Sequence, residues 1–335
     1  MRRAIITLTL LVAAVPAATA SAQTDPPKPA TIKLVIEKAG GDVSPLALKG
    51  SKFRIRGIVK PYVPGQKVTV RVQRGASKLR VKQLTVTKPP GATAGQFLLG
   101  FTPTKSGRLR IRASHLGTPE LATAVAKDRY VRVVRPYAVA GSKGPAVRLL
   151  QRLLDKQGYV VGARGLFDAR TARAVLAFRK VSGMARTQLA TEDVFKRLVN
   201  GGGAFKVRYP KHGHHVEGDL SAQVIALIDH GKVQRIYPIS SGKPSTPTVL
   251  GSFRVYRKDP GTNAKGMVFS SYFTGGYAIH GYVDVPVYAA SHGCLRTPVP
   301  DAVPIFDWVK FGDYVDVYYR DGSKTKAKRI ANPGP

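Results

Sequence analysis

The chain has 335 residues, more than one ordinary domain holds, and its 54 Lys and Arg against 19 Asp and Glu give a formal net charge of +35. Hydrophobic residues make up 43% of the chain, so packed cores are expected and wholesale disorder is excluded despite the charge. The single cysteine, Cys294, excludes an intramolecular disulfide and a multi-cysteine zinc site. The charge favours an anionic partner, among them nucleic acid, anionic lipid and wall polymers.

The N-terminus has the pattern of a secretory signal peptide over residues 1–22. Two arginines precede an apolar run that ends at Pro16, and small residues then offer cleavage after Ala20 or Ala22. The alternative is an uncleaved membrane anchor, which Pro16 and the small-residue tail oppose. We therefore expect an exported protein with no stable membrane span after cleavage. Export, and the lack of an interleaved aromatic platform, also oppose a nucleic-acid partner.

Residues 31–135 alternate apolar and polar side chains with the period of two that is typical of β-strands. Apolar residues take one face of each predicted strand, and Arg or Lys often takes the other. The pattern predicts an all-β, loosely immunoglobulin-like sandwich. This segment has 22 Lys and Arg against four Asp and Glu, a net charge of +18. Two interpretations stay open: solvated outer strand faces, or an electrostatic dock for an anionic polymer.

Residues 138–200 change to the helical period and predict a small bundle of three short helices. The first is expected to begin at Pro145 and to stop before Gly158. Asp168 and Thr191 are candidate N-caps of the second and third helices. The positions expected to be buried are Val147, Leu150, Leu154, Ala172, Val175, Phe178, Val194 and Leu198.

The helical segment carries a characteristic set of residues: Val147, Leu150, Gln151, Leu154, Gly158, Tyr159, Gly165, Phe167, Thr171, Ala174, Val175 and Phe178. This set resembles the helical peptidoglycan-binding domain of bacterial wall enzymes, and the resemblance covers essentially the whole segment. It departs from that family at Arg164 and Asp168, where an Asp-Gly pair and a Gly are usual. The resemblance implies wall polymers as partners and a wall-associated location.

Three glycines at 201–203 read as a linker into a third, β-rich part over residues 204–320. The elements expected there are a buried strand at 224–228, a strand at 253–256, a short helix at 305–309 and a closing strand at 315–318. The basic segment 321–335 is expected to be a flexible tail.

The chemistry-bearing residues gather between residues 277 and 296. The only thiol, that of Cys294, lies two residues after His292 and fourteen after His280. A cysteine nucleophile needs a base within hydrogen-bond reach and a group that orients this base. On residue chemistry alone, a catalytic cysteine and histidine, a buried small hydrophobe and a tolerated loop thiol all remain open.

The full motif consists of His280 and Gly281, followed by Ser291, His292, Gly293, Cys294, Leu295 and Arg296. It resembles the signature of L,D-transpeptidase catalytic domains of the YkuD type, and the likeness extends from Thr246 to about Tyr319. The resemblance implies a mostly-β catalytic domain in which the histidine and the cysteine meet in one cleft. It also implies acyl transfer on peptidoglycan stem peptides: thioester formation at the third stem residue, release of D-alanine, and a cross-link between third residues.

The resemblance also implies a role for each residue of the motif. Cys294 is the expected nucleophile and His280 the general base, oriented by the carbonyl of Gly281. Backbone N–H groups around Gly293 and Cys294 are expected to face the oxyanion. Arg296 is expected to engage a substrate carboxylate, with a structural ion pair as the alternative. The expected supporting and substrate-binding positions are Gly281, Ser291, His292, Gly293 and Arg296.

No cofactor and no metal are expected. His212, His214 and His215 are close in sequence, but no nearby cysteine or Glu-x-x-His pattern supports a metal site. Three functions remain: a cross-linking transpeptidase, an L,D-carboxypeptidase in which water replaces the acceptor amine, and a wall-binding scaffold with a vestigial active site. The intact His280 and Cys294 weigh against the scaffold. The acceptor, the diamino acid and the oligomeric state stay open.

Overall fold

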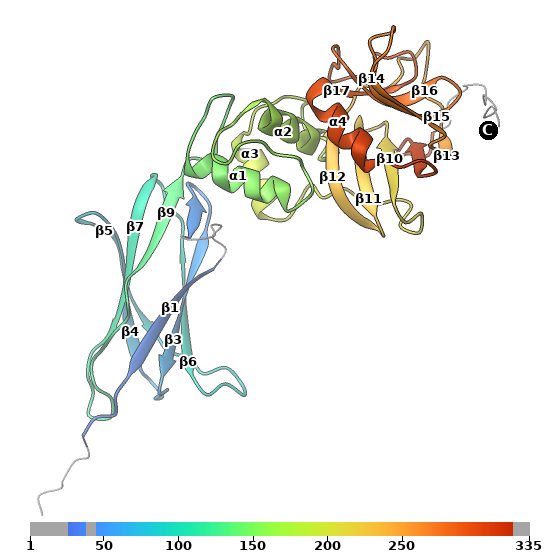
Figure 1. Cartoon of the computed structure of the whole chain (residues 1–335). Coiled ribbons are helices and arrows are strands. Elements are labelled where there is room, and N and C mark those ends of the chain that lie inside the picture. Colours follow the sequence, from blue (N-terminus) through green and yellow to red (C-terminus); the bar gives the residue numbers. More distant parts are fainter. Residues whose placement is uncertain (1–25, 38–44, 324–335) are drawn as a thin grey trace, which may run out of the picture.

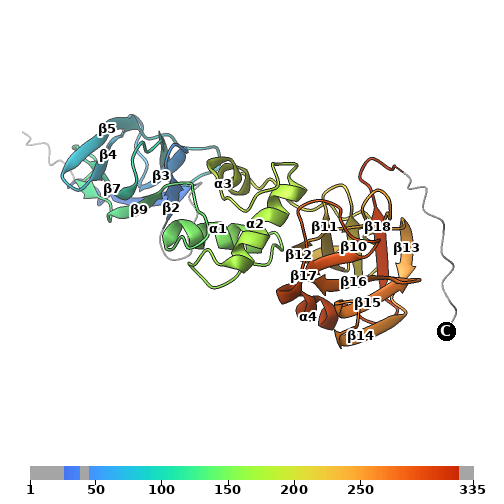
Figure 2. The same cartoon turned by 90° about the horizontal axis from the view of Figure 1, so that it is seen from above.

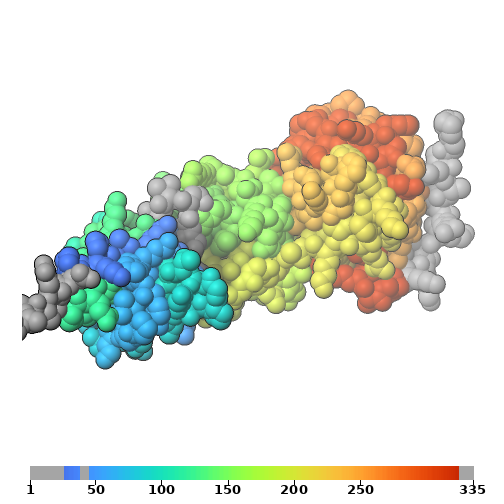
Figure 3. Space-filling view, turned by 90° about the horizontal axis from the view of Figure 1, so that it is seen from below, coloured from blue at the N-terminus to red at the C-terminus, as the bar shows by residue number. Residues whose placement is uncertain are grey.

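The computed structural model describes residues 26–37 and 45–323. Three units follow one another along an elongated molecule: a sandwich unit (31–134), a helical unit (145–199) and a C-terminal unit (215–318) (Figure 1, Figure 2). The space-filling view shows the same order, with the helical unit in the middle (Figure 3).

The predicted signal peptide at 1–22 lies outside the described residues, as do residues 324–335 of the predicted tail. Within the described ranges, no helix is long and apolar enough to cross a membrane.

The sandwich unit consists of two facing sheets. Its strands are β1 (Thr31–Glu37), β2 (Leu46–Leu48), β3 (Phe53–Lys60), β4 (Lys67–Arg74), β5 (Ser77–Thr85), β6 (Gly95–Phe101), β7 (Gly107–His115), β8 (Ala124–Val125) and β9 (Arg129–Val134). One sheet has the order β1-β3-β6, and the other has the order β2-β9-β7-β4-β5 with β8 paired to β7. The all-β architecture agrees with the alternation in the sequence, and the likeness to immunoglobulin domains stays a prediction.

Alternation along the strands determines which side chains form the core of the sandwich. Val68, Val70 and Val72 of β4 are fully buried, and apolar residues of both sheets join them in one cluster. Arg71 points to the other face of β4, where its guanidinium donates to Ser114 Oγ at 3.1 Å. Strand β5 is the edge of its sheet, and nearly all of its residues are exposed. Its basic side chains therefore face solvent.

The helical unit contains α1 (Pro145–Asp155), α2 (Ala169–Val181) and α3 (Glu192–Val199). The three predicted starts are confirmed. Pro145 opens α1, the Asp168 carboxylate accepts a hydrogen bond from the N–H of Thr171 at 2.8 Å, and Thr191 is the N-cap of α3 without capping through its side chain. All eight positions predicted to be buried are buried.

The helices do not close a core of their own. Their apolar side chains form one continuous cluster with Leu48 and Val134 of the sandwich unit and with Val224, Ile228 and Ile236 of the C-terminal unit. The predicted bundle is therefore better described as a helical layer between two β units, because its apolar faces are completed by neighbours on both sides.

The C-terminal unit has two sheets and one helix. Its elements are β10 (His215–Asp219), β11 (Val224–Asp229), β12 (Lys232–Pro238), β13 (Gly251–Arg254), β14 (Arg257–Thr262), β15 (Val268–Thr274), β16 (Tyr277–Tyr282), β17 (Leu295–Pro298), α4 (Val299–Trp308) and β18 (Tyr314–Tyr318). The sheet orders are β12-β11-β10-β18-β13 and β14-β15-β16-β17. The predicted strands correspond to β11, β13 and β18, and α4 packs on β15, β16 and β17.

The helix predicted at 305–309 has the wrong bounds, since α4 already begins at Val299. Pro304 lies inside α4 and interrupts the helical signal in the sequence. It has no N–H to donate to the carbonyl of Pro300, and this carbonyl instead accepts a hydrogen bond from Arg170 Nη2 at 3.3 Å. A side chain of the helical unit thus satisfies a backbone group of α4.

A buried ion pair joins α2 to α4. Arg173 donates through Nε and Nη2 to the two carboxylate oxygens of Asp301, at 2.6 and 2.9 Å, and Asp301 is only 2% exposed. Arg186 adds hydrogen bonds to the carbonyl oxygens of Val287 and Ser221, at 2.9 and 3.0 Å. The helical unit is therefore fastened to the C-terminal unit by polar contacts as well as by the shared core.

We expect Arg173→Ala to lower the free energy of unfolding of the two docked units by about 3 kcal/mol, because it leaves a buried carboxylate without its bidentate partner. Trp308, the single tryptophan of the chain, lies in α4, so its fluorescence during urea unfolding reports on this part of the molecule. Lys196→Ala removes an exposed ion pair with Glu192 and is the control, which should leave the midpoint unchanged. Equal midpoints for Arg173→Ala and the unaltered chain would contradict the prediction.

Candidate active site

Two neighbouring parallel strands position the predicted catalytic residues. Strands β16 and β17 pair with His280 opposite Arg296. Cys294 directly precedes β17, and its side chain packs against a small apolar cluster that includes Ala278, which lies two residues before His280 on β16. Because side chains two residues apart on a strand point to the same face, Cys294, His280 and Arg296 gather on one face of the strand pair.

The imidazole of His280 is buried, with 3% of the residue exposed. Its Nδ1 lies 2.8 Å from the carbonyl oxygen of Gly281. A carbonyl oxygen only accepts, so Nδ1 carries the proton and Nε2 is the basic nitrogen. Burial lowers the pKa of His280 to about 4, against the opposing effect of the hydrogen bond to Gly281. The ring is therefore neutral at neutral pH.

Helix α4 lies directly against the backbone beside His280. A Cβ at Gly281 would stand 2.6 Å from Cβ of Ala302, so only glycine allows this approach. Thr297 Oγ1 donates to the carbonyl of His280 at 3.1 Å and ties β17 to β16 next to the imidazole. These contacts fix the backbone that carries the imidazole, and the hydrogen bond to Gly281 orients the ring.

The thiol of Cys294 is partly exposed and donates to the carbonyl of Gly276, with Sγ and the oxygen 3.7 Å apart. Burial raises the pKa of Cys294, and the charges of Arg296 and Lys265 only partly oppose this effect. At neutral pH the thiol of Cys294 and the imidazole of His280 are therefore both neutral. An unprotonated Nε2 on the same face as a thiol can accept its proton during attack on a carbonyl.

The turn before Cys294 is locked by its own hydrogen bonds. Ser291 Oγ donates to the carbonyl of Cys294 at 2.6 Å and accepts from the N–H of Gly293 at 3.0 Å. Gly293 has a φ of 119°, and a Cβ there would fall 1.8 Å from the ring of Tyr277. The expectation that the N–H of Gly293 faces an oxyanion is not met, because Ser291 already accepts that N–H.

Arg296 stacks on an aromatic ring. Its guanidinium carbon lies 4.0 Å from the ring centroid of Tyr282, and no carboxylate of the described residues lies within ion-pair distance of it. The guanidinium is therefore available to an anionic group. His292 and Asp284 are both exposed. The imidazole of His280 donates its hydrogen bond to the carbonyl of Gly281, and no hydrogen bond of the described residues joins it to Asp284.

Two serines that the sequence did not single out hold the loop that leads to Cys294. Ser240 Oγ donates to the carbonyl of Tyr288 at 2.7 Å and accepts from the N–H of Ala290 at 3.1 Å. The carbonyl of Ser241 accepts from the N–H groups of Ala290 and Ser291, both at 2.9 Å. The sequence gives no sign of this role, because the loop that the two serines hold lies about 50 residues further along the chain.

The histidines near residue 214 pair with carboxylates. His212 Nδ1 lies 2.9 Å from Asp316, and His214 Nδ1 lies 2.8 Å from Asp313 while its ring stacks on Trp308. Across the described part of the chain, no group of three His, Cys, Asp or Glu side chains is placed to hold a metal ion. These contacts give the histidines a role in packing.

Two family models match the chain. One, described as the L,D-transpeptidase catalytic domain (YkuD), matches residues 213–317, and the other, described as a putative peptidoglycan binding domain, matches residues 143–198. The first range contains all of the site residues described above.

Known proteins give the same result. The crystal structure of an L,D-transpeptidase from Xylanimonas cellulosilytica is 32% identical, and the match covers 55% of this chain and 98% of that chain with a TM-score of 0.51. L,D-transpeptidase 1 of Mycobacterium tuberculosis is 28% identical over 124 residues, which cover 29% of this chain and 47% of that protein. The chain thus spans about half the length of the curated relative that it matches.

The crystal structure from Xylanimonas cellulosilytica is covered almost completely at more than 30% identity, and the family model matches around the strand pair that carries the thiol and the imidazole. On this evidence the chain belongs to the L,D-transpeptidase family, with a YkuD-type catalytic domain and a peptidoglycan-binding domain.

Proposed function

We propose that this protein is an exported, wall-associated cysteine L,D-transpeptidase that cross-links the third residues of peptidoglycan stem peptides. The observation that carries the proposal is the pairing of β16 with β17, which gathers a thiol, an imidazole with a basic Nε2 and a guanidinium on one face. Acyl transfer through a thioester needs a nucleophile, a base and stabilisation of negative charge, and these three groups supply them.

In the first half of the proposed reaction, Cys294 Sγ bonds to the carbonyl carbon of the third stem residue while His280 Nε2 takes the thiol proton. The N–H of Cys294 and the charge of Arg296 stabilise the oxyanion, since the N–H of Gly293 is engaged by Ser291. The bond to D-alanine then breaks, and His280 returns its proton to the leaving amine. A thioester remains on Cys294.

In the second half, an amine of a neighbouring stem attacks the thioester carbonyl and gives a proton to His280. The carbon–sulfur bond breaks, the new amide is released, and the proton returns to the sulfur of Cys294. With water as the acceptor the same steps produce a carboxylate, which is the L,D-carboxypeptidase alternative. Mass spectrometry of the products separates the two, because cross-linking gives a dimer and hydrolysis gives a tripeptide stem.

We propose the sandwich unit as an electrostatic dock for anionic wall polymers. Four cationic side chains line a cavity of about 460 Å³ beside β5, and no Asp or Glu is among its lining residues. The four are Lys52, Arg74, Arg80 and Lys105. None of them has an ion-pair partner among the described residues, so each is available to an anion.

We expect Cys294→Ala to abolish the release of D-alanine from tetrapeptide muropeptides, while binding to isolated wall is unchanged. His280→Ala should also lose the activity by at least a hundredfold, because the thiol then lacks its base. His230→Ala, which removes an imidazole 84% exposed on its side chain, is the matched control and should keep full activity. Undiminished release of D-alanine by Cys294→Ala would refute the mechanism.

Alkylation of Cys294 by iodoacetamide should rise about tenfold per pH unit from pH 6 to above pH 8, with no plateau near neutrality. The thiolate is the reactive form, and a pKa raised above the ordinary thiol value keeps the thiolate fraction small throughout this range. The chain has no other cysteine, so the measured rate belongs to Cys294. The urea-unfolded chain is the control and should level off at lower pH. A plateau in the folded protein below pH 7 would indicate a preformed thiolate–imidazolium pair.

Binding of the whole chain to isolated wall should weaken as salt rises from 50 to 500 mM, since exposed charges are screened. Arg74→Gln together with Arg80→Gln should reduce the affinity at low salt and flatten the salt dependence. The control is Arg132→Gln together with Arg135→Gln, which removes two charges outside the cavity. It should reduce the affinity and the salt dependence by less. Binding that does not respond to salt would rule out the electrostatic dock.

A further inference from the structure

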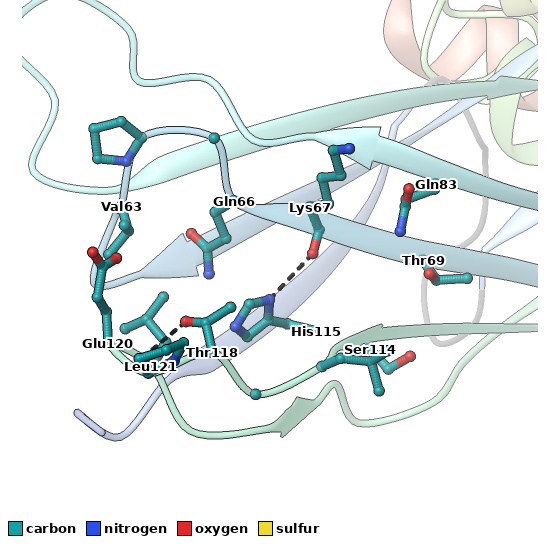
Figure 4. Close-up of a pocket in the computed structure, with 15 residues that line it drawn as sticks. Val63, Gln66, Lys67, Thr69, Gln83, Ser114, His115, Thr118, Glu120 and Leu121 are labelled. Atoms are coloured by element: carbon teal, nitrogen blue, oxygen red, sulfur yellow. Dashed lines mark hydrogen bonds between the residues drawn. The ribbon is translucent and has the colours of Figure 1, made fainter. Parts of the chain in front are cut away.

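The far end of the sandwich unit contains a second cavity, of about 480 Å³ (Figure 4). It lies between the turn at 63–67, which leads into β4, and the segment 115–121, which follows β7. Strand β9 enters the helical unit after Val134, and β7 runs antiparallel to it and ends at His115. The cavity is therefore at the end of the sandwich that points away from the helices and the active site (Figure 1).

Two buried polar side chains at this cavity have unpartnered atoms. Gln66 is 5% exposed, and neither Nε2 nor Oε1 of its amide has a hydrogen-bond partner. His115 is 2% exposed, and its Nδ1 donates to the carbonyl of Lys67 at 3.2 Å. Its Nε2 is then an acceptor, and it too has no partner. Figure 4 shows both side chains turned into the space between the two segments.

Buried polar groups in folded proteins are nearly always paired, so three unpartnered atoms at one cavity point to a ligand that completes them. That ligand has to accept from the Gln66 amide, donate to it, and donate to His115. A secondary amide does the first two at once, because its carbonyl and N–H match those of a carboxamide. A hydroxyl group does the third.

We propose that this cavity binds an N-acetylated sugar residue of a glycan chain. The acetamido group pairs with the amide of Gln66, and a ring hydroxyl donates to Nε2 of His115. Apolar side chains at the cavity meet the methyl group and the faces of the sugar ring, among them Leu116, which is 77% exposed. The volume lies within the range of pockets that hold small ligands.

The charges at the cavity favour a neutral sugar over a peptide stem. Lys67 and Glu120 both line it and have opposite charges, in a unit whose net charge is otherwise strongly positive. The two charges offset each other, so the cavity has no net positive charge with which to select a carboxylate-bearing stem peptide. The remaining polar lining is neutral and rich in hydroxyl groups, from Thr69, Ser114 and Thr118. Such groups pair readily with sugar hydroxyls, which both donate and accept.

The cavity is remote from Cys294, so a glycan bound there does not compete with the stem peptide that is being cross-linked. The proposed wall location supplies the source of the sugar, but the binding itself requires no acyl transfer. A failure of the sugar site and a failure of the transpeptidase mechanism are thus separable, because one is measured by binding and the other by release of D-alanine.

The test is binding of N,N′-diacetylchitobiose to the full chain by calorimetry or by saturation-transfer NMR. Cellobiose, the same disaccharide without acetamido groups, should bind at least tenfold more weakly. Gln66→Leu should weaken chitobiose binding at least tenfold and leave the thermal unfolding midpoint unchanged or higher, since it removes two unpaired buried atoms. Gln73→Leu, the same substitution at the other end of β4, is the matched control and should bind normally.

Three results would overturn the proposal. The first is no binding of chitobiose at millimolar concentration, which leaves the cavity to water. The second is chitobiose binding that Gln66→Leu does not weaken, which places the sugar elsewhere on the chain. The third is stronger binding of N-acetylalanine methylamide than of chitobiose, which identifies the partner as a peptide amide.

Discussion

The proposed active site depends on one short parallel pairing, that of β16 with β17. This pairing brings together His280 and Cys294, which are fourteen residues apart in sequence. Strand β17 is itself held from both sides. Arg296 pairs with β16 on one side and exchanges two backbone hydrogen bonds of 3.0 Å with Ser240 on the other. Hydrogen bonds of Ser291 close the turn before β17. Helix α4, which follows β17, packs against Gly281 of β16. A shift of register by one residue would turn the side chain of Cys294 to the opposite face.

Burial of this strand pair also sets the protonation state of its groups. It lowers the pKa of His280 and raises that of Cys294, so the two charged forms are both disfavoured before substrate binds. A neutral thiol also suits the proposed extracytoplasmic location, because a lone thiolate is prone to oxidation there. A thiol that stays protonated until a carbonyl carbon is in reach reacts with oxidants slowly. The charge of Arg296 favours the thiolate form of Cys294 and so partly opposes the effect of burial.

The helix starts, which depend on neighbouring residues in the chain, could be predicted from the sequence, and two other features could not. The helix starts at Pro145, Asp168 and Thr191 are local signals, and the structure confirms them. The start of α4 at Val299 was not predicted because Pro304 interrupts the helical signal, and the hydrogen bond that the carbonyl of Pro300 accepts comes from Arg170, more than a hundred residues earlier. The hydrogen bond from the Gly293 N–H to Ser291 Oγ was not predicted either, because the sequence motif contains both residues but does not show where the N–H and the hydroxyl point.

The helical unit, which matches a peptidoglycan-binding domain, is packed tightly against the C-terminal unit. Its α2 completes the apolar face of β11 and β12, and its Lys180, which is 4% exposed, donates to the carbonyls of Gln223 and Ile239. Burial, together with the charge of Arg186, lowers the pKa of Lys180 to about 7, so this amine is only partly protonated at neutral pH. Arg186 donates to the carbonyl of Val287, which lies in the loop that leads to Cys294. An independent wall anchor on a flexible linker would need none of these contacts. The helical unit is therefore packed as part of the fold that carries the candidate active site, and these contacts fix its orientation relative to that site.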